Sequence, residues 1–247
     1  MAIQSTKTRL VIGSATEAWD FSGVSNSLEV KVAGEKIDNT RFQDTAKRFT
    51  TGETEGTITQ NGYFDETGAL SFEQEIAQTV LNLETLWVCA IYGTDQTVPV
   101  GYIAPSTNTE NMAISAPIGG LITLNGSWLS GLGLKRGFQV YRGTISATGT
   151  SSYIDVGAVG SAGGYAWLFV TTVTGTATNA DIDLESDDNT SFTSAAVEGT
   201  FTFTGKGVTQ VTLSGTIDRY LRLNTTDLGG ATSFLVTVIA AVSGVTY

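Results

Sequence analysis

The side chains that most often carry out enzyme chemistry are scarce or poorly placed in this sequence. The chain contains no histidine, so it lacks the residue whose pKa lies nearest neutrality and which is the commonest metal ligand. Its one cysteine, Cys89, lies in the apolar run 86–91, where no histidine can activate it as a nucleophile. We therefore predict a buried, inert thiol, no internal disulfide and no Ser or Cys catalytic triad.

A cluster of carboxylates in the second half could suggest a calcium site. Its members are Asp181, Asp183, Glu185, Asp187 and Asp188. Apolar residues alternate with the first three, which indicates the exposed face of a strand. No glycine and no later glutamate follow the spacing of an EF-hand loop. Residues 186–190 instead predict a hairpin turn in which Asp and Asn side chains bond their own backbone.

Other candidate sites are equally weak. A glycosidase needs two carboxylates, but nothing singles out a pair among the 24 acidic residues. The glycine-rich segment 160–164 is not followed by a lysine-bearing helix, so it is no phosphate loop. The four tryptophans lie in or beside apolar runs and are expected in the core rather than on a sugar-binding platform. They are Trp19, Trp87, Trp128 and Trp167. We predict no enzyme, no cofactor and no metal.

Composition limits the partners. With 13 basic and 24 acidic residues, the chain has a net charge of −11, which repels nucleic-acid phosphate and argues against tight DNA binding. It is compatible with a surface along which DNA slides without adhering. With 41% hydrophobic residues, the chain is too apolar for disorder. The start does not resemble a secretion signal and no long uncharged apolar segment is present, so we expect a soluble chain without membrane contact.

The hydrophobic pattern indicates strands through most of the chain. Apolar and polar residues alternate with period two in many short runs, which is typical of strands with one buried face. The runs are 28–32, 57–59, 121–124, 138–142, 181–185, 200–203, 210–213, 219–223 and 234–238. One segment differs, because Phe72, Ile76 and Val80 share a helical face after the N-cap Ser71. We predict an all-β fold, mainly β with one flanking helix over 71–84.

Two further segments depart from the alternation. Residues 35–56 are rich in charges of both signs with few apolar residues, and predict a long polar loop that docks on a neighbouring molecule or is simply solvated. Residues 143–152 are typical of a linker or wide turn, and basic residues become rare after them. We predict a β-sandwich or barrel domain over 1–145 and a second β-sandwich-like module over 146–247, unless the second half continues the first sandwich.

Short motifs resemble those of one protein family. Residues 38–45 have the pattern Asp-x-Thr-x-Phe-x-Asp, and the strand-like run that follows ends in Gly62-Tyr63-Phe64-Asp65. Together they resemble the major tail (tail tube) proteins of long-tailed bacteriophages, although these often carry a proline before the glycine that is Gly52 here. Residues 185–192, 201–203 and 215–222 are similar to a β module found at the C-terminus of many such proteins.

The resemblance implies a structural virion protein of the phage tail, assembled in the host cytoplasm. Six copies would form a ring whose inner strands make a continuous barrel, and stacked rings would form a hollow tube through which DNA passes without specific binding. The implied partners are the tail terminator, the distal tail protein and a tape measure protein inside the lumen. The loop 35–56 would contact the adjacent ring. Its expected contact residues are the apolar anchors Phe42 and Phe49 with the polar partners Asp38, Arg41, Asp44 and Arg48.

Three alternatives to the tail tube remain open on the sequence. The second half could be a carbohydrate-binding or adhesin module that uses Tyr165, Trp167 or Tyr220 as a stacking platform. The chain could be another phage structural protein, such as a capsid decoration protein or a tail terminator. A glycosidase-like β enzyme is the third alternative.

Overall fold

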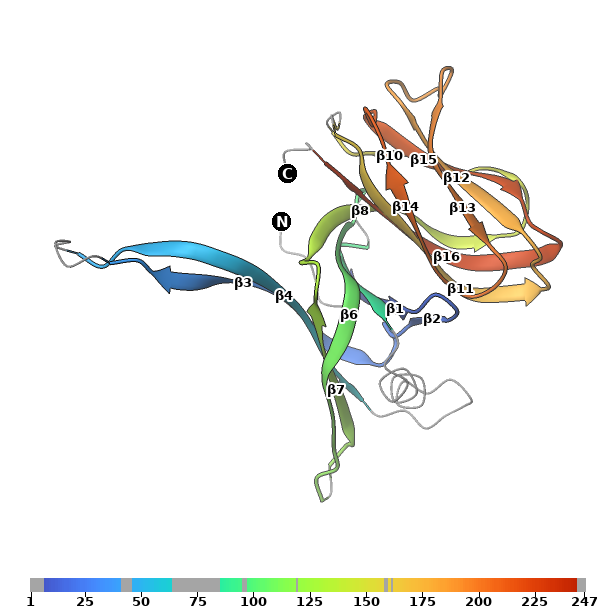
Figure 1. Cartoon of the computed structure of the whole chain (residues 1–247). Coiled ribbons are helices and arrows are strands. Elements are labelled where there is room, and N and C mark those ends of the chain that lie inside the picture. Colours follow the sequence, from blue (N-terminus) through green and yellow to red (C-terminus); the bar gives the residue numbers. More distant parts are fainter. Residues whose placement is uncertain are drawn as a thin grey trace. The chain divides into compact units, whose positions relative to one another are not determined.

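The chain is described by a computed structural model over residues 7–40, 46–63, 85–94, 97–118, 120–157, 160 and 162–243, with only the backbone described for 35–37, 49–54 and 108. All secondary-structure elements assigned within these residues are β-strands, and the strands pair in antiparallel sheets (Figure 1). The first eight are β1 (Thr8–Gly13), β2 (Ala18–Asp20), β3 (Ser25–Asp38), β4 (Phe49–Tyr63), β5 (Leu86–Tyr92), β6 (Val100–Ser115), β7 (Thr123–Ser130) and β8 (Lys135–Ile145). The others are β9 (Gly149–Thr150), β10 (Ile154–Asp155), β11 (Gly164–Gly175), β12 (Ala180–Asp187), β13 (Ala196–Phe203), β14 (Gly207–Leu213), β15 (Tyr220–Asp227) and β16 (Ala231–Val242).

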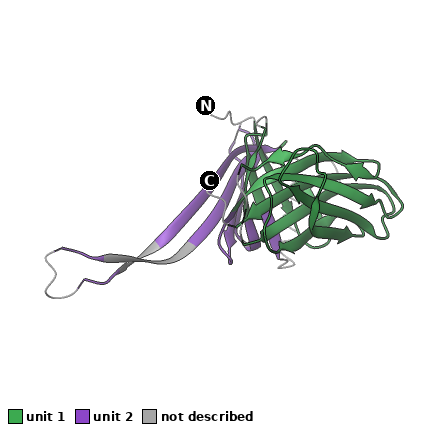
Figure 2. Cartoon of the chain, turned by 90° about the horizontal axis from the view of Figure 1, so that it is seen from above, with its two compact units in different colours: residues 1–23, 89–103, 136–247 green, residues 24–88, 104–135 purple. Residues whose placement is uncertain are grey.

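The chain forms two compact units that each contain several separate segments of sequence. The first unit comprises 1–23, 89–103 and 136–247, and the second comprises 24–88 and 104–135 (Figure 2). This division does not follow the predicted boundary near residue 145, because β8 lies before that residue and pairs with β16 near the C-terminus. A separate module over 146–247 therefore stays a prediction.

The first unit contains a β-sandwich. Strands β14, β11, β16 and β8 are neighbours in one sheet, and β10, β15, β12 and β13 are neighbours in the other. The alternating apolar residues of both sheets meet in one buried cluster, in which the Phe203 and Phe234 rings lie 4.9 Å apart, edge to face. The period-two pattern of the sequence thus supplies one buried face for each sheet.

Strand β11 is buried on both of its faces. Residues 166–170 form an unbroken buried run, in which Leu168 belongs to the sandwich core and Trp167 lies on the opposite side. The indole Nε1 of Trp167 donates a hydrogen bond to Gln210 at 2.9 Å, so this buried polar group is satisfied. Strands β1 and β2 are also apolar and buried, which fits a layer that covers this second face.

The second unit is built on the strand order β3-β4-β7-β6. In this unit β4 pairs with β3 over its whole length but with β7 only from Gly56 to Tyr63. Strand β7 pairs in turn with residues 107–115 of β6. The β3–β4 pair therefore begins as part of a four-stranded sheet and continues beyond it as a two-stranded ribbon (Figure 1).

The all-β fold predicted from alternation is confirmed. The runs at 28–32, 57–59, 138–142, 181–185, 200–203, 210–213 and 234–238 all lie within strands. Cys89 is fully buried in β5, and burial raises the pKa of its thiol. The helix predicted over 71–84 lies outside the described residues. No helix long and apolar enough to cross a bilayer occurs in the part of the chain that the structure describes.

Candidate self-assembly surface

The four-stranded sheet of the second unit has one apolar, buried face. Cross-strand partners in antiparallel sheets point to the same side, and the row Val30, Ile58 and Trp128 shows which side is buried. Ile58 and Trp128 are completely inaccessible to solvent. At Gly56 on this face a Cβ atom would lie 2.4 Å from Cγ of Leu134, so the close approach of that leucine requires glycine.

The opposite face of the same sheet is polar and partly open to solvent. We call it the polar face. It contains Ser27, Glu29 and Lys31 of β3, Glu55, Thr57, Thr59 and Asn61 of β4, Thr123, Asn125 and Ser127 of β7, and Glu110, Asn111 and Ser115 of β6, together with the less polar Tyr63, Ala113 and Leu129. Hydroxyl and amide groups dominate, and the Ser127 hydroxyl donates a hydrogen bond to Glu110 at 3.1 Å. Its described charges are three carboxylates and the one ammonium of Lys31.

The outer part of the β3–β4 ribbon, which we call the arm, extends beyond the sheet. In the arm, residues 33–38 of β3 pair with residues 49–55 of β4, and β3 has no other strand neighbour among the described residues. A register shift between Gly34 and Lys36 adds a bulge, which increases local twist. Its described side chains, among them those of Ala33, Asp38 and Glu55, are exposed, so the described part of the arm has no core of its own.

Hydrogen bonds organise the far end of the arm. The carboxylate of Asp38 accepts hydrogen bonds from the hydroxyl and the backbone N–H of Thr40, and these lower the pKa of Asp38. The Thr40 hydroxyl also accepts the N–H of Arg48 at 3.0 Å, and the Asn39 N–H donates to the Arg48 carbonyl at 3.1 Å. These bonds hold the two chain segments together just beyond the last strand pair, Asp38 opposite Phe49.

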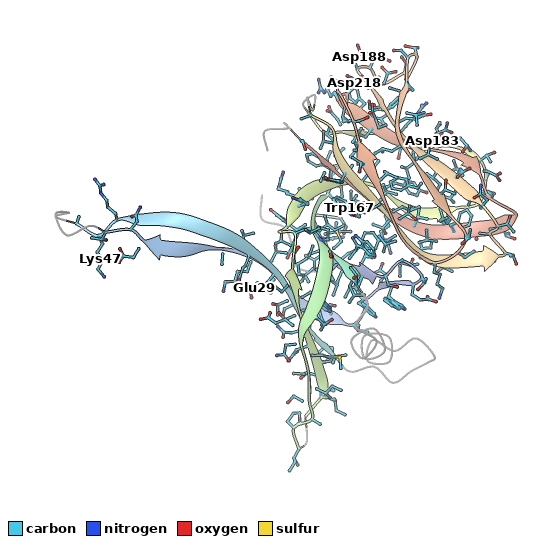
Figure 3. All side chains as sticks on the ribbon, in the orientation of Figure 1. Glu29, Lys47, Trp167, Asp183, Asp188 and Asp218 are labelled. Carbon is cyan, nitrogen blue, oxygen red and sulfur yellow. The ribbon has the colours of Figure 1, made fainter. Side chains whose placement is uncertain are left out.

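The six predicted contact residues can now be located in part. Asp38 and Arg48 have exposed side chains at the end of the arm. Figure 3 labels Lys47 in the same region. Phe49 is the backbone partner of Asp38. Arg41, Phe42 and Asp44 lie outside the described residues. The predicted loop over 35–56 is too long, because β3 runs to Asp38 and β4 begins at Phe49.

The carboxylates of Asp181, Asp183 and Glu185 form hydrogen bonds with side chains of neighbouring strands. The prediction that Asp181, Asp183 and Glu185 form an exposed strand face is wrong for Glu185, which is 6% exposed and bound by Arg222 and Asn224 at 2.7 and 2.8 Å. Asp181 and Asp183 accept hydrogen bonds from threonine hydroxyls of the adjacent strand. Within the described ranges, no group of three or more acidic or cysteine side chains is arranged to hold a metal ion.

The predicted turn after β12, in which Asp and Asn side chains bond their own backbone, is confirmed. One oxygen of Asp187 accepts the N–H of Asn189, and the other accepts the N–H of Ser194, both at 3.0 Å. Asn189 in turn accepts the N–H of Ser191. The side-chain oxygens of Asp187 and Asn189 therefore accept backbone N–H groups of their own turn and stabilise its conformation.

The aromatic residues proposed as a sugar platform are only partly available. Trp167 is 1% exposed, and Trp19 and Trp128 are buried as well, which agrees with a place in the core, whereas Trp87 is only half-buried. Tyr165 is 40% exposed beside the Trp167 ring. Tyr220 packs edge to face on Tyr153 at 5.5 Å, with the Arg219 guanidinium over its ring. Trp167 is therefore excluded as a stacking surface.

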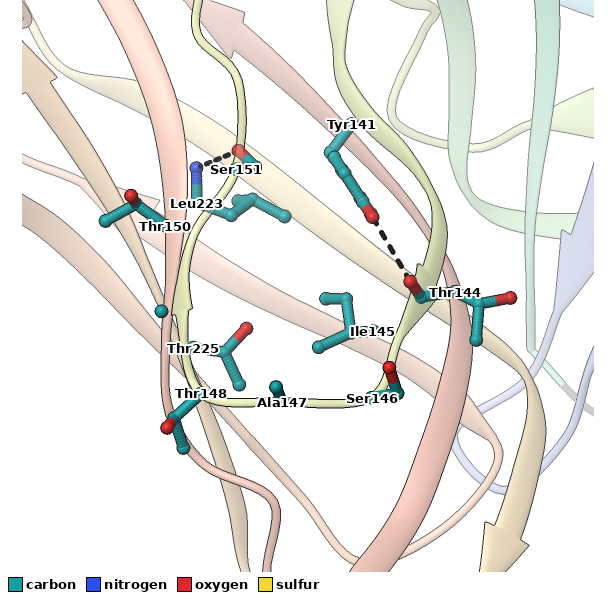
Figure 4. A pocket seen from close by; sticks show the side chains of 11 residues that line it. Tyr141, Thr144, Ile145, Ser146, Ala147, Thr148, Thr150, Ser151, Leu223 and Thr225 are labelled. Carbon is teal, nitrogen blue, oxygen red and sulfur yellow. Dashed lines mark hydrogen bonds between the residues drawn. The ribbon is translucent and has the colours of Figure 1, made fainter.

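A small hollow in the first unit lies at the connection between β8 and β9 (Figure 4). Its volume is about 270 Å³, and most of its lining side chains carry hydroxyl groups or are small. The Tyr141 hydroxyl donates a hydrogen bond to the Thr144 carbonyl at 3.4 Å, and Ser151 accepts the N–H of Leu223 at 3.0 Å. The lining contains no carboxylate, so this hollow offers no acid–base pair for hydrolysis.

Solved structures with similar folds come from phage tails and related particles. A chain from the virion of the native gene transfer agent particle matches with a TM-score of 0.42 and 13% identity, covering 54% of this chain and 97% of that chain. The SPP1 tail tube matches with a TM-score of 0.43 and 10% identity, covering 55% and 78%. The SPP1 Dit protein, described as a paradigm of the hub adsorption apparatus in Gram-positive-infecting phages, matches with a TM-score of 0.30 and 13% identity, covering 93% and 98%. No protein-family model and no curated protein sequence matches the chain.

Proposed function

We propose that this chain is the subunit of a phage tail tube, a structural virion protein that forms stacked rings of six copies and has no catalytic activity. The observation that carries the proposal is the edge strand β3, which has one strand neighbour, β4, among the described residues and extends with it as the arm. The motifs in residues 38–65 and in the second half support the same reading.

Ring closure follows from the physics of edge strands. An unpaired strand edge offers a row of N–H and C=O groups that pair readily with another chain. Strand β3 lies at one side of the group β3-β4-β7-β6, and residues 109–115 of β6 lie at the other. Pairing of β3 in one copy with β6 in the next would continue the sheet around the ring, and closure would leave no edge free.

The polar face provides a surface that DNA could pass. Continued around a ring, it would line the lumen with threonine, serine and asparagine side chains together with Glu29, Glu55 and Glu110. The excess of carboxylates over Lys31 repels phosphate, so no counterions would be released and DNA would not adhere. The buried face would then be directed away from the lumen.

The arm would make the contact between rings. Its described side chains are exposed in the single chain, which fits a segment that completes its contacts on a neighbour. The predicted contact set of Asp38, Arg41, Phe42, Asp44, Arg48 and Phe49 is part of this proposal. Terminator, distal tail and tape measure proteins would be its further partners in the assembled tail.

Electron microscopy of the concentrated full chain, combined with sedimentation velocity of the dilute protein, tests the proposal. We expect monomers at low concentration and long hollow tubes with sixfold symmetry at high concentration. Closed small oligomers would indicate a tail terminator instead. Monomers or trimers at all concentrations would indicate a decoration protein, and glycan binding by the full chain without tubes would indicate an adhesin.

Removal of the end of the arm should separate folding from assembly. We expect a chain lacking residues 38–52 to fold, because the four-stranded sheet begins only at Gly56 of β4, but to form no tubes. Circular dichroism and thermal unfolding check the fold, and electron microscopy checks assembly. Tubes of normal length from this variant would show that the arm is not the contact between rings.

A further inference from the structure

The hairpin between β6 and β7 ends in an exposed apolar patch, which we call the tip patch. It consists of Ile114, Ile118, Leu121 and Ile122. Ile118 is fully exposed and Leu121 is 68% exposed. The Gly120 N–H donates a hydrogen bond to the Pro117 carbonyl at 3.1 Å, where the β6–β7 hairpin turns (Figure 1). Single exposed apolar residues are ordinary, but four of them on one hairpin mark a contact surface.

A second apolar patch lies at the other end of the same strands, and we call it the base patch. It consists of Val32, Leu132 and Leu134. Strand β7 ends at Ser130, which pairs with Gly56, and Gly56 in turn pairs with Val32. Leu132 follows in the next turn with 64% exposure, while Leu134 packs on Gly56. The eight residues of β7 separate the two patches by about 26 Å.

The charge distribution favours a second copy of this chain as the binding partner of the tip patch. The whole chain carries a net charge of −11, so two copies repel each other wherever charged surfaces meet. Residues 111–134 contain no charged side chain, and this uncharged stretch connects the tip patch to Leu132 and Leu134 of the base patch. The tip patch and the residues that flank it therefore present no like charge to a second copy that approaches the end of the hairpin.

We propose that the tip patch of one copy docks on the base patch of another copy, in a head-to-tail contact. When each copy uses its tip patch on one neighbour and its base patch on another, the contact repeats along an axis. The contact would thus add a second connection between stacked rings, beside the arm. This inference rests on the proposed tube only for its place in the assembly, because the contact itself needs just two copies.

Cross-linking of cysteine variants of the full chain tests this contact directly. We would prepare Ile118→Cys and Leu132→Cys as separate proteins and treat each alone, and their mixture, with a short bismaleimide. Native Cys89 is fully buried and burial raises its pKa, so it should not react. We expect a cross-linked dimer in the mixture and none in either protein alone. No dimer in the mixture would overturn the proposal, as would dimers from Ile118→Cys alone, which indicate a symmetric contact.

A second variant connects the contact to assembly. We expect Ile118→Ser to raise the concentration needed for polymerisation at least about tenfold, because each contact loses a buried apolar side chain. Val197→Ser on β13 is the matched control, since Val197 is 56% exposed outside both patches, and it should leave that concentration unchanged. Thermal unfolding should be the same for wild type and both variants.

The outcomes separate this inference from the proposed function. A cross-link between the Ile118→Cys and Leu132→Cys proteins, without tubes at any concentration, would refute the tube and leave the head-to-tail contact standing. Tubes that form normally from Ile118→Ser, without the cross-link, would overturn the contact alone. Binding of the wild type to phosphatidylcholine vesicles, lost in Ile118→Ser and accompanied by no cross-link, would overturn it in favour of a lipid surface.

Discussion

At the scale of single residues, the charged groups of this chain have structural roles that depend strongly on burial. Glu185 is buried and bonded by Arg222, whose guanidinium also lies 4.0 Å from the centre of the Phe192 ring. Asp155 and Arg219 form an equally short pair at 2.7 Å, but both side chains are more exposed. Similar distances therefore carry different energies, because solvent screens the exposed pair.

We expect Arg222→Ala to lower the free energy of unfolding by about 3 kcal/mol, since it leaves a buried carboxylate without its cation. Urea denaturation at neutral pH measures this change. Arg219→Ala is the matched control and should change stability far less. Equal losses from the two variants would contradict the assigned difference in burial.

Asp20 predicts a dependence of stability on pH. Burial acts to raise the pKa of Asp20, but hydrogen bonds from Ser22 and Arg142 outweigh it and hold the pKa below its ordinary value. A lowered pKa in the folded state stabilises the protein above the pKa of the unfolded chain, and this contribution is lost as the pH falls through the folded value.

We therefore expect Asp20→Asn to lower the free energy of unfolding by about 1–3 kcal/mol at pH 7, and the difference from wild type to shrink below about pH 4. Urea denaturation across this pH range provides the measurement. The exposed Glu29→Gln should show no such convergence. A difference that stays constant down to about pH 2 would mean that ionisation of Asp20 is not its source.

At the scale of elements, alternation predicted strands wherever one face of a sheet is buried. The run 28–32 extends far beyond its alternating part, to Asp38, because β3 pairs with β4 in the arm without covering a core. A ribbon without a buried face leaves no apolar periodicity, so the sequence of residues 35–56 predicts a loop. The alternation over 121–124 predicts a half-buried strand, but β7 begins only at Thr123 and leaves Leu121 and Ile122 exposed in the tip patch.

The sequence does not predict which strands far apart in the chain pair with each other. The composition change near residue 145 is real, but β8 before it pairs with β16 through residues such as Thr144 and Leu235. Local composition does not record which distant strand becomes a neighbour. Likewise, the burial of Glu185 follows from Arg222 and Asn224 on another strand, and no spacing around the acidic segment indicates them.

We expect the backbone hydrogen bonds of the arm to be less stable than those of the four-stranded sheet. The amides of the arm depend on a single strand pair, whereas residues 56–62 of β4 are paired on both sides. We expect hydrogen exchange at 33–34 and 50–55 to be much faster than at 56–62 in the monomer, and to slow on assembly. Mass spectrometry of both states measures it. Equal exchange of the arm in monomer and assembly would remove it from the contact.

At the scale of the whole molecule, assembly must overcome the mutual repulsion of like-charged copies. Each copy carries a net charge of −11, so bringing six into a ring and stacking the rings concentrates negative charge. The uncharged tip of the β6–β7 hairpin lessens this repulsion where it makes contact, and the charges of both signs at the end of the arm, such as Asp38, Lys47 and Arg48, can pair locally. The remaining repulsion acts over the Debye length, which falls from about 30 Å at 0.01 M salt to about 8 Å at 0.15 M.

We therefore expect salt to promote polymerisation, with a lower threshold concentration at about 0.15 M than at about 0.01 M sodium chloride. Light scattering across a dilution series measures the threshold, and electron microscopy identifies the product. Glu29→Gln and Glu110→Gln together remove two carboxylates from the polar face, and should reduce this dependence if that face lines the ring. The opposite result, tubes that dissolve as salt is added, would mean that attractive ion pairs such as those of Asp38 and Arg48 dominate the contact between copies.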